Sequence, residues 1–229
     1  MITHSWISYR NKTIFWLPMD TQELYYQNLK KSRDQLDRFG WIDRQIKYKF
    51  NSHGFRCDEF TNINNAVFLG CSHTAGVGLP VENTWPYFVI KELNLTCYNL
   101  AIGGGSNDLA FRISYHYLER LRPKMVFLLS PEPARIEGQS VHDTISFLPG
   151  NNDPTYYYKL YLSNEENLLL NQQKNIFAIE NLCHRLDIKF VCIKEIHDIP
   201  DDQRDRARDL VHNGPKTNLY WSKKFLDKV

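Results

Sequence analysis

Short apolar stretches alternate with longer amphipathic stretches along most of this 229-residue chain. The nearly continuous apolar runs lie at residues 66–70, 96–102, 124–130 and 188–196. Runs without polar alternation are typical of strands that are covered on both faces of a parallel sheet. The intervening spacing of apolar residues predicts helices over residues 82–93, 107–121 and 165–187, and a last helix from about residue 215. This alternation predicts an α/β fold: a three-layer, flavodoxin-like α/β/α arrangement around a parallel sheet.

The beginning of the chain departs from this pattern. Residues 21–38 predict a solvated helix with a weak apolar stripe, and residues 46–60 predict a short extended piece. No linker rich in Pro, Gly or Ser separates this region from the rest. We therefore divide the chain into an N-terminal extension, residues 1–45, packed on a main α/β domain, residues 46–229. The extension either covers an edge of the sheet or meets a partner.

Composition excludes several classes of protein. The formal charge is +2, from 28 Lys and Arg against 26 Asp and Glu. The chain therefore lacks the large excess of basic residues that is typical of proteins that bind nucleic acid or a membrane surface. The five cysteines have no CxxC or Cys/His metal spacing, which favours a reduced intracellular chain. Neither a signal peptide nor an apolar run of membrane-spanning length is evident, so we expect a cytoplasmic location.

Three short polar strings follow predicted strands or precede a predicted helix: GCSHTAG at 70–76, IGGGSND at 102–108 and DLVHNGP at 209–215. The carboxyl ends of parallel strands share one edge of the sheet, where sites in such folds collect. Ser72 is either a turn or capping residue or a nucleophile. Asp209 and His212 are either a solvated pair on a charged loop or an acid that orients a base.

The glycine string Gly103-Gly104-Gly105 has two readings as well. It provides unusual backbone dihedrals after a strand, or it lets a backbone N–H approach an oxyanion. It is not a dinucleotide-binding fingerprint, and no phosphate-binding loop of the GxxxxGK[ST] type is present. A nucleotide-binding flavodoxin-like domain is therefore the weakest of the functional hypotheses.

Taken together, the three strings resemble those of the SGNH (GDSL-type) hydrolase family. Gly70-Cys71-Ser72 is similar to the family's first block and Tyr98–Gly105 to its second, while Asp209 and His212 match the last block. The resemblance implies that Ser72 is the catalytic nucleophile and that Asp209 and His212 complete a triad. It also implies an oxyanion hole, to which we assign Gly104, Gly105 and Asn107.

Two positions depart from the family pattern. Cys71 stands where an aspartate commonly precedes the serine, and we interpret it as a packing thiol. After the third strand, where the family commonly has an asparagine that donates to the oxyanion, the chain reads Ser130-Pro131-Glu132-Pro133-Ala134-Arg135. Either Asn107 supplies the missing amide or Arg135 points a charge at the site.

The sequence thus predicts a serine esterase that cleaves a small acyl ester, such as an acetyl group on a carbohydrate, with no metal or organic cofactor. Its alternative is an inactive SGNH-like scaffold used for binding or assembly. The segment 131–163 contains Tyr156, Tyr157, Tyr158 and Tyr161, which either form a lid over a sugar ring or belong to a surface loop. We expect no nucleic-acid or membrane partner, and the sequence does not indicate an oligomeric state.

Overall fold

The computed structural model describes residues 3–139, 144–147, 164–194 and 197–229. Tyr156, Tyr157, Tyr158 and Tyr161 lie outside the described residues. The strands are β1 (Thr13–Ile14), β2 (Tyr48–Lys49), β3 (Asn65–Leu69), β4 (Thr96–Asn99), β5 (Met125–Leu129), β6 (Ile136–Gln139), β7 (Thr144–Phe147) and β8 (Lys189–Ile193). The α-helices are α1 (Gln22–Lys31), α2 (Arg33–Arg38), α3 (Ser72–Ala75), α4 (Trp85–Leu93), α5 (Asn107–Leu121), α7 (Glu165–Arg185) and α8 (Pro215–Leu226). Short 3-10 helices cover η1 (Ile7–Tyr9), η2 (Val81–Asn83) and η3 (Asp201–Gln203).

A parallel sheet of four strands, in the order β4-β3-β5-β8, forms the centre of the molecule. Its strands are the four that the apolar runs predict: β3 begins one residue earlier than its run and has the same length, and the other three are shorter than their runs. From β3 the chain first adds β4 on one side and then β5 on the other. In open parallel sheets, such a reversal of strand order is where ligands bind, at the carboxyl ends of the strands.

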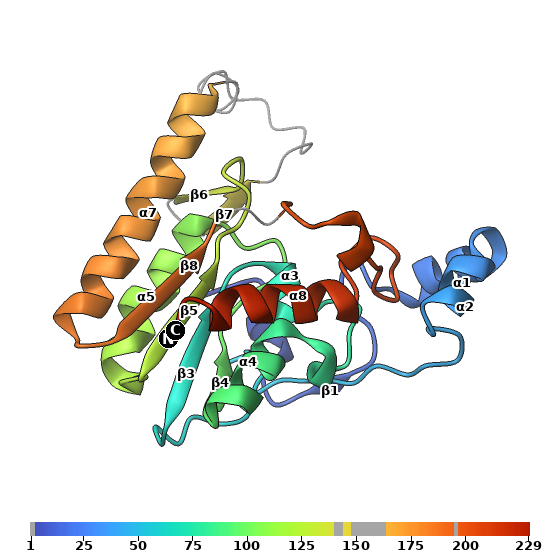
Figure 1. The fold of residues 1–229 in the computed structure, drawn as a ribbon, viewed down its shortest axis with the longest axis horizontal. Helices are drawn as coiled ribbons and strands as arrows, with labels where there is room; N and C mark the ends of the chain where they lie inside the picture. Colours follow the sequence, from blue (N-terminus) through green and yellow to red (C-terminus); the bar gives the residue numbers. More distant parts are fainter. Residues whose placement is uncertain (1–2, 140–143, 148–163, 195–196) are drawn as a thin grey trace.

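Helices cover both faces of this sheet, as Figure 1 shows: α5 and α7 lie on one face, and α4 and α8 on the other. The side chains of β3 alternate accordingly. Phe68 stacks on Phe127, with ring centroids 5.0 Å apart, in an apolar cluster with Trp85 and Phe225. Val67 belongs to the cluster on the opposite face. The structure is therefore the predicted three-layer α/β/α arrangement.

The N-terminal segment is less regular than its pattern predicts. The single helix expected over residues 21–38 is two helices, α1 and α2, because Ser32 adopts a non-helical conformation with φ −142° and ψ 34°. The extended piece expected over residues 46–60 forms only β2, which pairs antiparallel with β1. Leu36 and Trp41 are fully buried, so this segment packs into the apolar interior through a few large side chains.

One prediction about stability concerns His4, whose ring stacks on Phe55 and whose Nε2–H donates to the His53 carbonyl. Burial lowers the pKa of His4 to about 4. Between that value and the unfolded value of about 6.5, His4 is protonated in the unfolded chain and neutral in the folded chain. The free energy of unfolding therefore falls as the pH falls through this range. We expect His4 to account for about 3 kcal/mol of this loss.

Urea unfolding from about pH 7 to about pH 4 checks this expectation. The His4→Gln variant should show a smaller loss of stability over this range than the unmodified protein. His184→Gln, at an exposed position near the end of α7, should follow the unmodified protein. Identical pH profiles for His4→Gln and the unmodified protein would contradict the assignment.

Candidate active site

Ser72 is the first residue of the short helix α3, two residues after β3 ends. Gly70 makes this turn possible, because its φ of +148° suits glycine and a Cβ there would lie 2.3 Å from Thr74 Oγ1. The Asn99 amide donates to the Thr74 carbonyl at 2.7 Å and so ties α3 to the end of β4. The sequence thus folds into a strand, a strained glycine turn and a helix that begins at Ser72.

Asp209 and His212 form a buried pair in the turn before α8. The Asp209 Oδ1 accepts the backbone N–H groups of Val211 and His212, each at 2.9 Å, and Oδ2 accepts from His212 Nδ1. Asp209 is only 2% exposed, so three donors replace water around its carboxylate. With Nδ1 occupied, the remaining ring nitrogen of His212, Nε2, is available to a substrate or a nucleophile.

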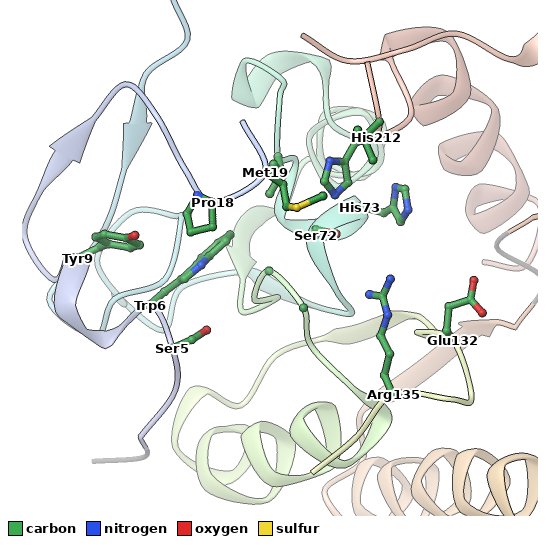
Figure 2. A pocket seen from close by; sticks show the side chains of 14 residues that line it. Ser5, Trp6, Tyr9, Pro18, Met19, Ser72, His73, Glu132, Arg135 and His212 are labelled. Atoms are coloured by element: carbon green, nitrogen blue, oxygen red, sulfur yellow. The ribbon is translucent and has the colours of Figure 1, made fainter. Parts of the chain in front are cut away.

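Ser72 and His212 line the same cavity, which has a volume of about 610 Å³ (Figure 2). A cavity of this size is in the range of small-molecule sites. No hydrogen bond joins the Ser72 hydroxyl to His212 in this structure. Catalytic hydrogen bonds are often long without substrate and tighten in the reacting complex. The cavity is further lined by Ser5, Trp6, Tyr9, Pro18, Met19, His73, Val77, Gly103, Gly104, Glu132, Arg135 and Val211.

The N-terminal segment forms one wall of this cavity, which the sequence analysis does not anticipate. Trp6, Tyr9, Pro18 and Met19 contribute apolar side chains to it and lie on the left and centre of Figure 2. Trp6 is 3% exposed, and a Cβ on Gly103 would lie 2.6 Å from its ring. The glycine therefore lets the indole approach the loop after β4. The sequence signal for this wall is only the aromatic-rich start of the chain.

The glycines after β4 have different surroundings. Gly104 lines the cavity with φ +73°, and its N–H donates to no acceptor among the described residues. The same holds for the N–H of Ser72. Gly105, in contrast, is buried, and its N–H donates to the Ile102 carbonyl at 3.0 Å. The backbone groups available to an oxyanion are therefore those of Ser72 and Gly104, and the expected contribution of Gly105 has no support from this contact.

The contacts of Asn107 differ from those expected of an oxyanion donor. Its amide donates to the Pro131 carbonyl at 3.0 Å, and its carbonyl oxygen accepts from the Ser130 hydroxyl at 2.8 Å. The side-chain amide of Gln172, on α7, donates to the Ser130 hydroxyl oxygen and to the Pro131 carbonyl. Asn107 is 1% exposed and is not among the cavity-lining residues. It anchors the loop after β5, and these contacts do not support a role as oxyanion donor.

His73, next to the serine, also faces the cavity. Its ring packs edge-on against His212 and Trp221, at centroid distances of 5.2 and 5.5 Å. Burial lowers the pKa of His73 well below its ordinary value, so the ring is neutral near neutral pH. Cys71 is buried in the apolar cluster of Phe68 and Trp85, as expected for a packing thiol.

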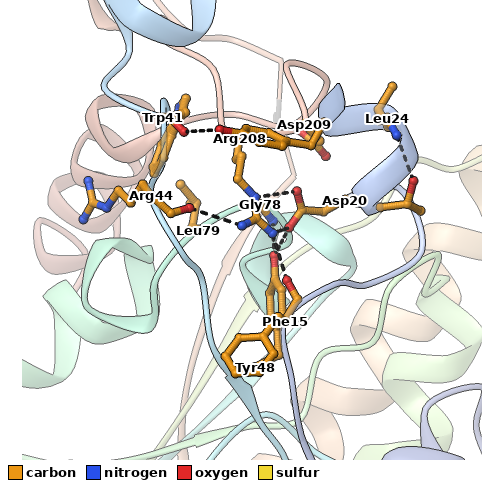
Figure 3. A network of polar contacts seen from close by, with 12 residues as sticks. Phe15, Asp20, Leu24, Trp41, Arg44, Tyr48, Gly78, Leu79, Arg208 and Asp209 are labelled. Atoms are coloured by element: carbon orange, nitrogen blue, oxygen red, sulfur yellow. Dashed lines mark hydrogen bonds and ion pairs between the residues drawn. The ribbon is translucent and has the colours of Figure 1, made fainter. Parts of the chain in front are cut away.

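A network of buried polar contacts fastens the turn of Asp209 to the N-terminal segment (Figure 3). Arg208 donates to both carboxylate oxygens of Asp20, at 3.0 and 2.6 Å, and both side chains are at most 2% exposed. The Tyr48 hydroxyl donates to the same carboxylate and accepts from the Gly78 N–H. Burial, together with the Asp20 charge, raises the pKa of Tyr48 and keeps its hydroxyl protonated.

Two more hydrogen bonds reach this turn from the N-terminal helices and their connection to β2. The Trp41 indole N–H donates to the Arg206 carbonyl at 2.7 Å. The Asn28 amide donates to the Asp209 carbonyl at 3.2 Å. We call this set of contacts, from Asp20, Asn28 and Trp41 to residues 206–209, the N-terminal clamp. It holds the backbone on which the Asp209–His212 pair is built.

The described residues contain no group of three or more His, Cys, Asp or Glu side chains arranged to hold a metal ion. None of the described helices is both long enough and apolar enough to span a membrane.

No protein-family model and no curated protein matches the sequence. Solved structures that resemble the model include TesA, with 14% identity, a TM-score of 0.39 and coverage of 56% of this chain and 58% of TesA. The esterase EstA from Pseudoalteromonas sp. has 15% identity and a TM-score of 0.36, with coverage of 72% and 99%. AlinE4, described as an SGNH-hydrolase family esterase, has 12% identity and a TM-score of 0.28, with coverage of 72% and 96%.

The chain thus spans about three fifths of TesA and nearly all of EstA. Structural similarity at TM-scores below 0.5 does not support a conclusion about activity. The activity is therefore inferred from the geometry of the site itself. EstA and AlinE4 are both described as esterases, and AlinE4 belongs to the SGNH family that the sequence motifs of this chain resemble.

Proposed function

We propose that this chain is a serine esterase of the SGNH type, with Ser72 as nucleophile, His212 as general base and Asp209 as the residue that orients the base. One observation carries the proposal. Ser72 and His212 line a common cavity, while Asp209 occupies the other ring nitrogen of His212. A serine, a base that faces it and an acid that fixes the base are the requirements for nucleophilic acyl transfer.

In the first half of the reaction, Ser72 Oγ attacks the carbonyl carbon of the ester and His212 Nε2 takes the hydroxyl proton. The negative charge that forms on the carbonyl oxygen is stabilised by the N–H groups of Ser72 and Gly104. The bond to the alcohol then breaks, and the proton passes from Nε2 to the leaving oxygen. An acyl group remains on Ser72.

In the second half, a water molecule gives a proton to His212 Nε2 and attacks the acyl carbon. The bond to Ser72 Oγ breaks, Oγ takes the proton back, and the acid leaves. Throughout, the Asp209 carboxylate holds Nδ1–H and stabilises the imidazolium while it is charged. Its bonds to the N–H groups of Val211 and His212 fix its orientation before the substrate arrives.

For the substrate, we propose a small acyl group, such as acetyl, on a larger alcohol of carbohydrate type. The cavity of about 610 Å³ is much larger than an acetyl group and leaves room for the alcohol. The rings of Trp6 and Tyr9 on its wall are suited to packing against the face of a sugar.

The alternative, a scaffold that binds without catalysis, has one observation in its favour. Residues 130–135, directly after β5, contain no asparagine, and the Asn107 amide, which could have replaced it, donates to the Pro131 carbonyl. Loss of one oxyanion donor typically lowers turnover by about 100- to 1000-fold. The two hypotheses differ in whether Ser72 is an activated nucleophile.

Labelling with a fluorophosphonate probe separates them. We expect one adduct by intact mass, mapped to Ser72 by peptide mass spectrometry, because the probe reacts with activated serines. His212→Ala should slow labelling by at least about 100-fold, since the base contributes that much to activating the hydroxyl. His184→Gln is the matched control and should label at the unmodified rate. A folded, unmodified protein that takes up no probe would overturn the esterase proposal in favour of the scaffold.

A further inference from the structure

Arg135 lies in the loop after β5 and lines the same cavity as Ser72 and His212. In Figure 2 its guanidinium extends from the loop toward Ser72 and His73. Its Nη1 is buried and has no hydrogen-bond partner among the described residues. A guanidinium carries its charge at any physiological pH, and a buried donor without a partner costs free energy. A hydrogen-bond acceptor of a ligand that enters the cavity would therefore pair this donor.

Other arginines with buried or half-buried side chains have hydrogen-bond partners within the protein. Arg208 is paired with Asp20, and Arg112 donates two hydrogen bonds to Glu137. Arg56 donates to main-chain carbonyls, including those of Gly76 and Leu79. Arg135 differs from all three because its buried Nη1 has neither a carbonyl nor a carboxylate as a hydrogen-bond partner among the described residues.

The other polar side chains at the cavity do not cancel this charge. Glu132 also lines the cavity, but its carboxylate is in contact with the His197 imidazole, and no ion pair joins it to Arg135. His73 is neutral, so it adds no second positive charge. The loop itself is fixed, because Asn107 and Gln172 anchor the Pro131 carbonyl. The backbone of the loop that carries Arg135 is thus held in place before a ligand arrives, which favours recognition of a defined anionic group.

We propose that Arg135 selects substrates whose alcohol part carries an anionic group, such as a carboxylate. The inference rests on the proposed function, since it names the substrate class of the same site. A small acyl group occupies only the vicinity of Ser72. The remaining space, bounded by Trp6 and Tyr9 on one side and Arg135 on the other, receives the alcohol.

Steady-state kinetics on two acetyl esters test this selection. One is 4-acetoxybenzoate, whose leaving alcohol carries a carboxylate, and the other is its neutral methyl ester. We expect Arg135→Gln to lower kcat/KM for the anionic ester by about 10- to 100-fold and to leave the neutral ester nearly unchanged. The comparison between variants cancels the different intrinsic reactivity of the two esters. Arg33→Gln, which removes an equal charge from an exposed position, should change neither rate.

An equal loss on both esters would overturn the selection, because it would assign Arg135 to the oxyanion that every substrate forms. Unchanged rates for Arg135→Gln on both esters would overturn it as well.

A binding measurement keeps the inference separate from the proposed function. Calorimetric titration of Ser72→Ala with each ester needs no turnover. We expect the anionic ester to bind at least about tenfold more tightly than the neutral one, and Ser72→Ala/Arg135→Gln to lose this difference. Equal affinities, or no binding of either ester, would contradict the inference. Selective binding to a protein that neither hydrolyses esters nor takes up the fluorophosphonate would refute the esterase proposal while supporting the anion site.

Discussion

Replacement of Ser72 by alanine is expected to lower kcat for ester hydrolysis by about 10⁶-fold, because the proposed nucleophile is removed and its partners cannot act without it. The remaining members of a triad contribute little alone, so what is left comes from binding and the oxyanion donors. The change removes only a hydroxyl that makes no hydrogen bond to the described residues. The fold should therefore be unaffected, and circular dichroism with urea unfolding checks that it is.

Cys71→Ala is the matched control for this prediction, since it alters the neighbouring residue and removes the only other nucleophile of the first block. Its thiol is buried in the apolar cluster beneath β3 and does not line the cavity. We expect a modest loss of stability and nearly full activity. The assignment of Ser72 fails if Cys71→Ala abolishes turnover and Ser72→Ala retains it.

The second large effect is expected from Asp20→Asn. It leaves the Arg208 guanidinium buried without its counter-charge, although the two residues lie 188 positions apart in sequence. Removal of one partner of a buried ion pair typically costs about 3–5 kcal/mol of folding free energy. The free energy of unfolding of an ordinary domain is about 5–15 kcal/mol, so the variant would lose much of its stability. Urea unfolding of the variant at neutral pH measures the effect.

Two control variants test whether the loss of stability comes from the buried ion pair of Asp20 and Arg208. Asp58→Asn breaks the exposed ion pair of Lys49 and Asp58 and should cost less than about 1 kcal/mol, because water screens that pair. Asp20→Leu/Arg208→Met removes both charges and should recover much of the stability lost by Asp20→Asn. If Asp20→Asn were as stable as Asp58→Asn, the N-terminal clamp would not hold the molecule together.

The sheet and its helices could be predicted because local patterns determine them. The helix over residues 107–121 has the predicted bounds, with the Ser106 hydroxyl capping its first turn. The four apolar runs gave the four strands in a sheet that buries both faces. The helix of residues 21–38 was predicted as one, since nothing in its pattern shows that Ser32 leaves the helical conformation.

The candidate site could be predicted only in part, for physical reasons. Ser72, Gly104 and His212 belong to polar strings that follow a strand or precede a helix, and all three line one cavity. Asn107 has the right residue type and lies near the right loop, but whether its amide faces a cavity or a carbonyl depends on Ser130 and Gln172, which are distant in sequence. Trp6 and Asp20 could not be found, because their roles arise from contacts with segments about 100 and 190 residues away.

The N-terminal clamp also has a consequence for how the protein is made. The N-terminal residues of the cavity wall and Asp20 are synthesised before Ser72, and residues 206–212 are synthesised long after it. During synthesis on the ribosome, a nascent chain therefore carries Ser72 long before Asp209 and His212 exist. The clamp can close only when Arg208 and its neighbours arrive. Under the proposed mechanism, Ser72 is activated only after residues 206–212 have joined the fold, so a nascent chain that lacks them carries an ordinary, unreactive hydroxyl.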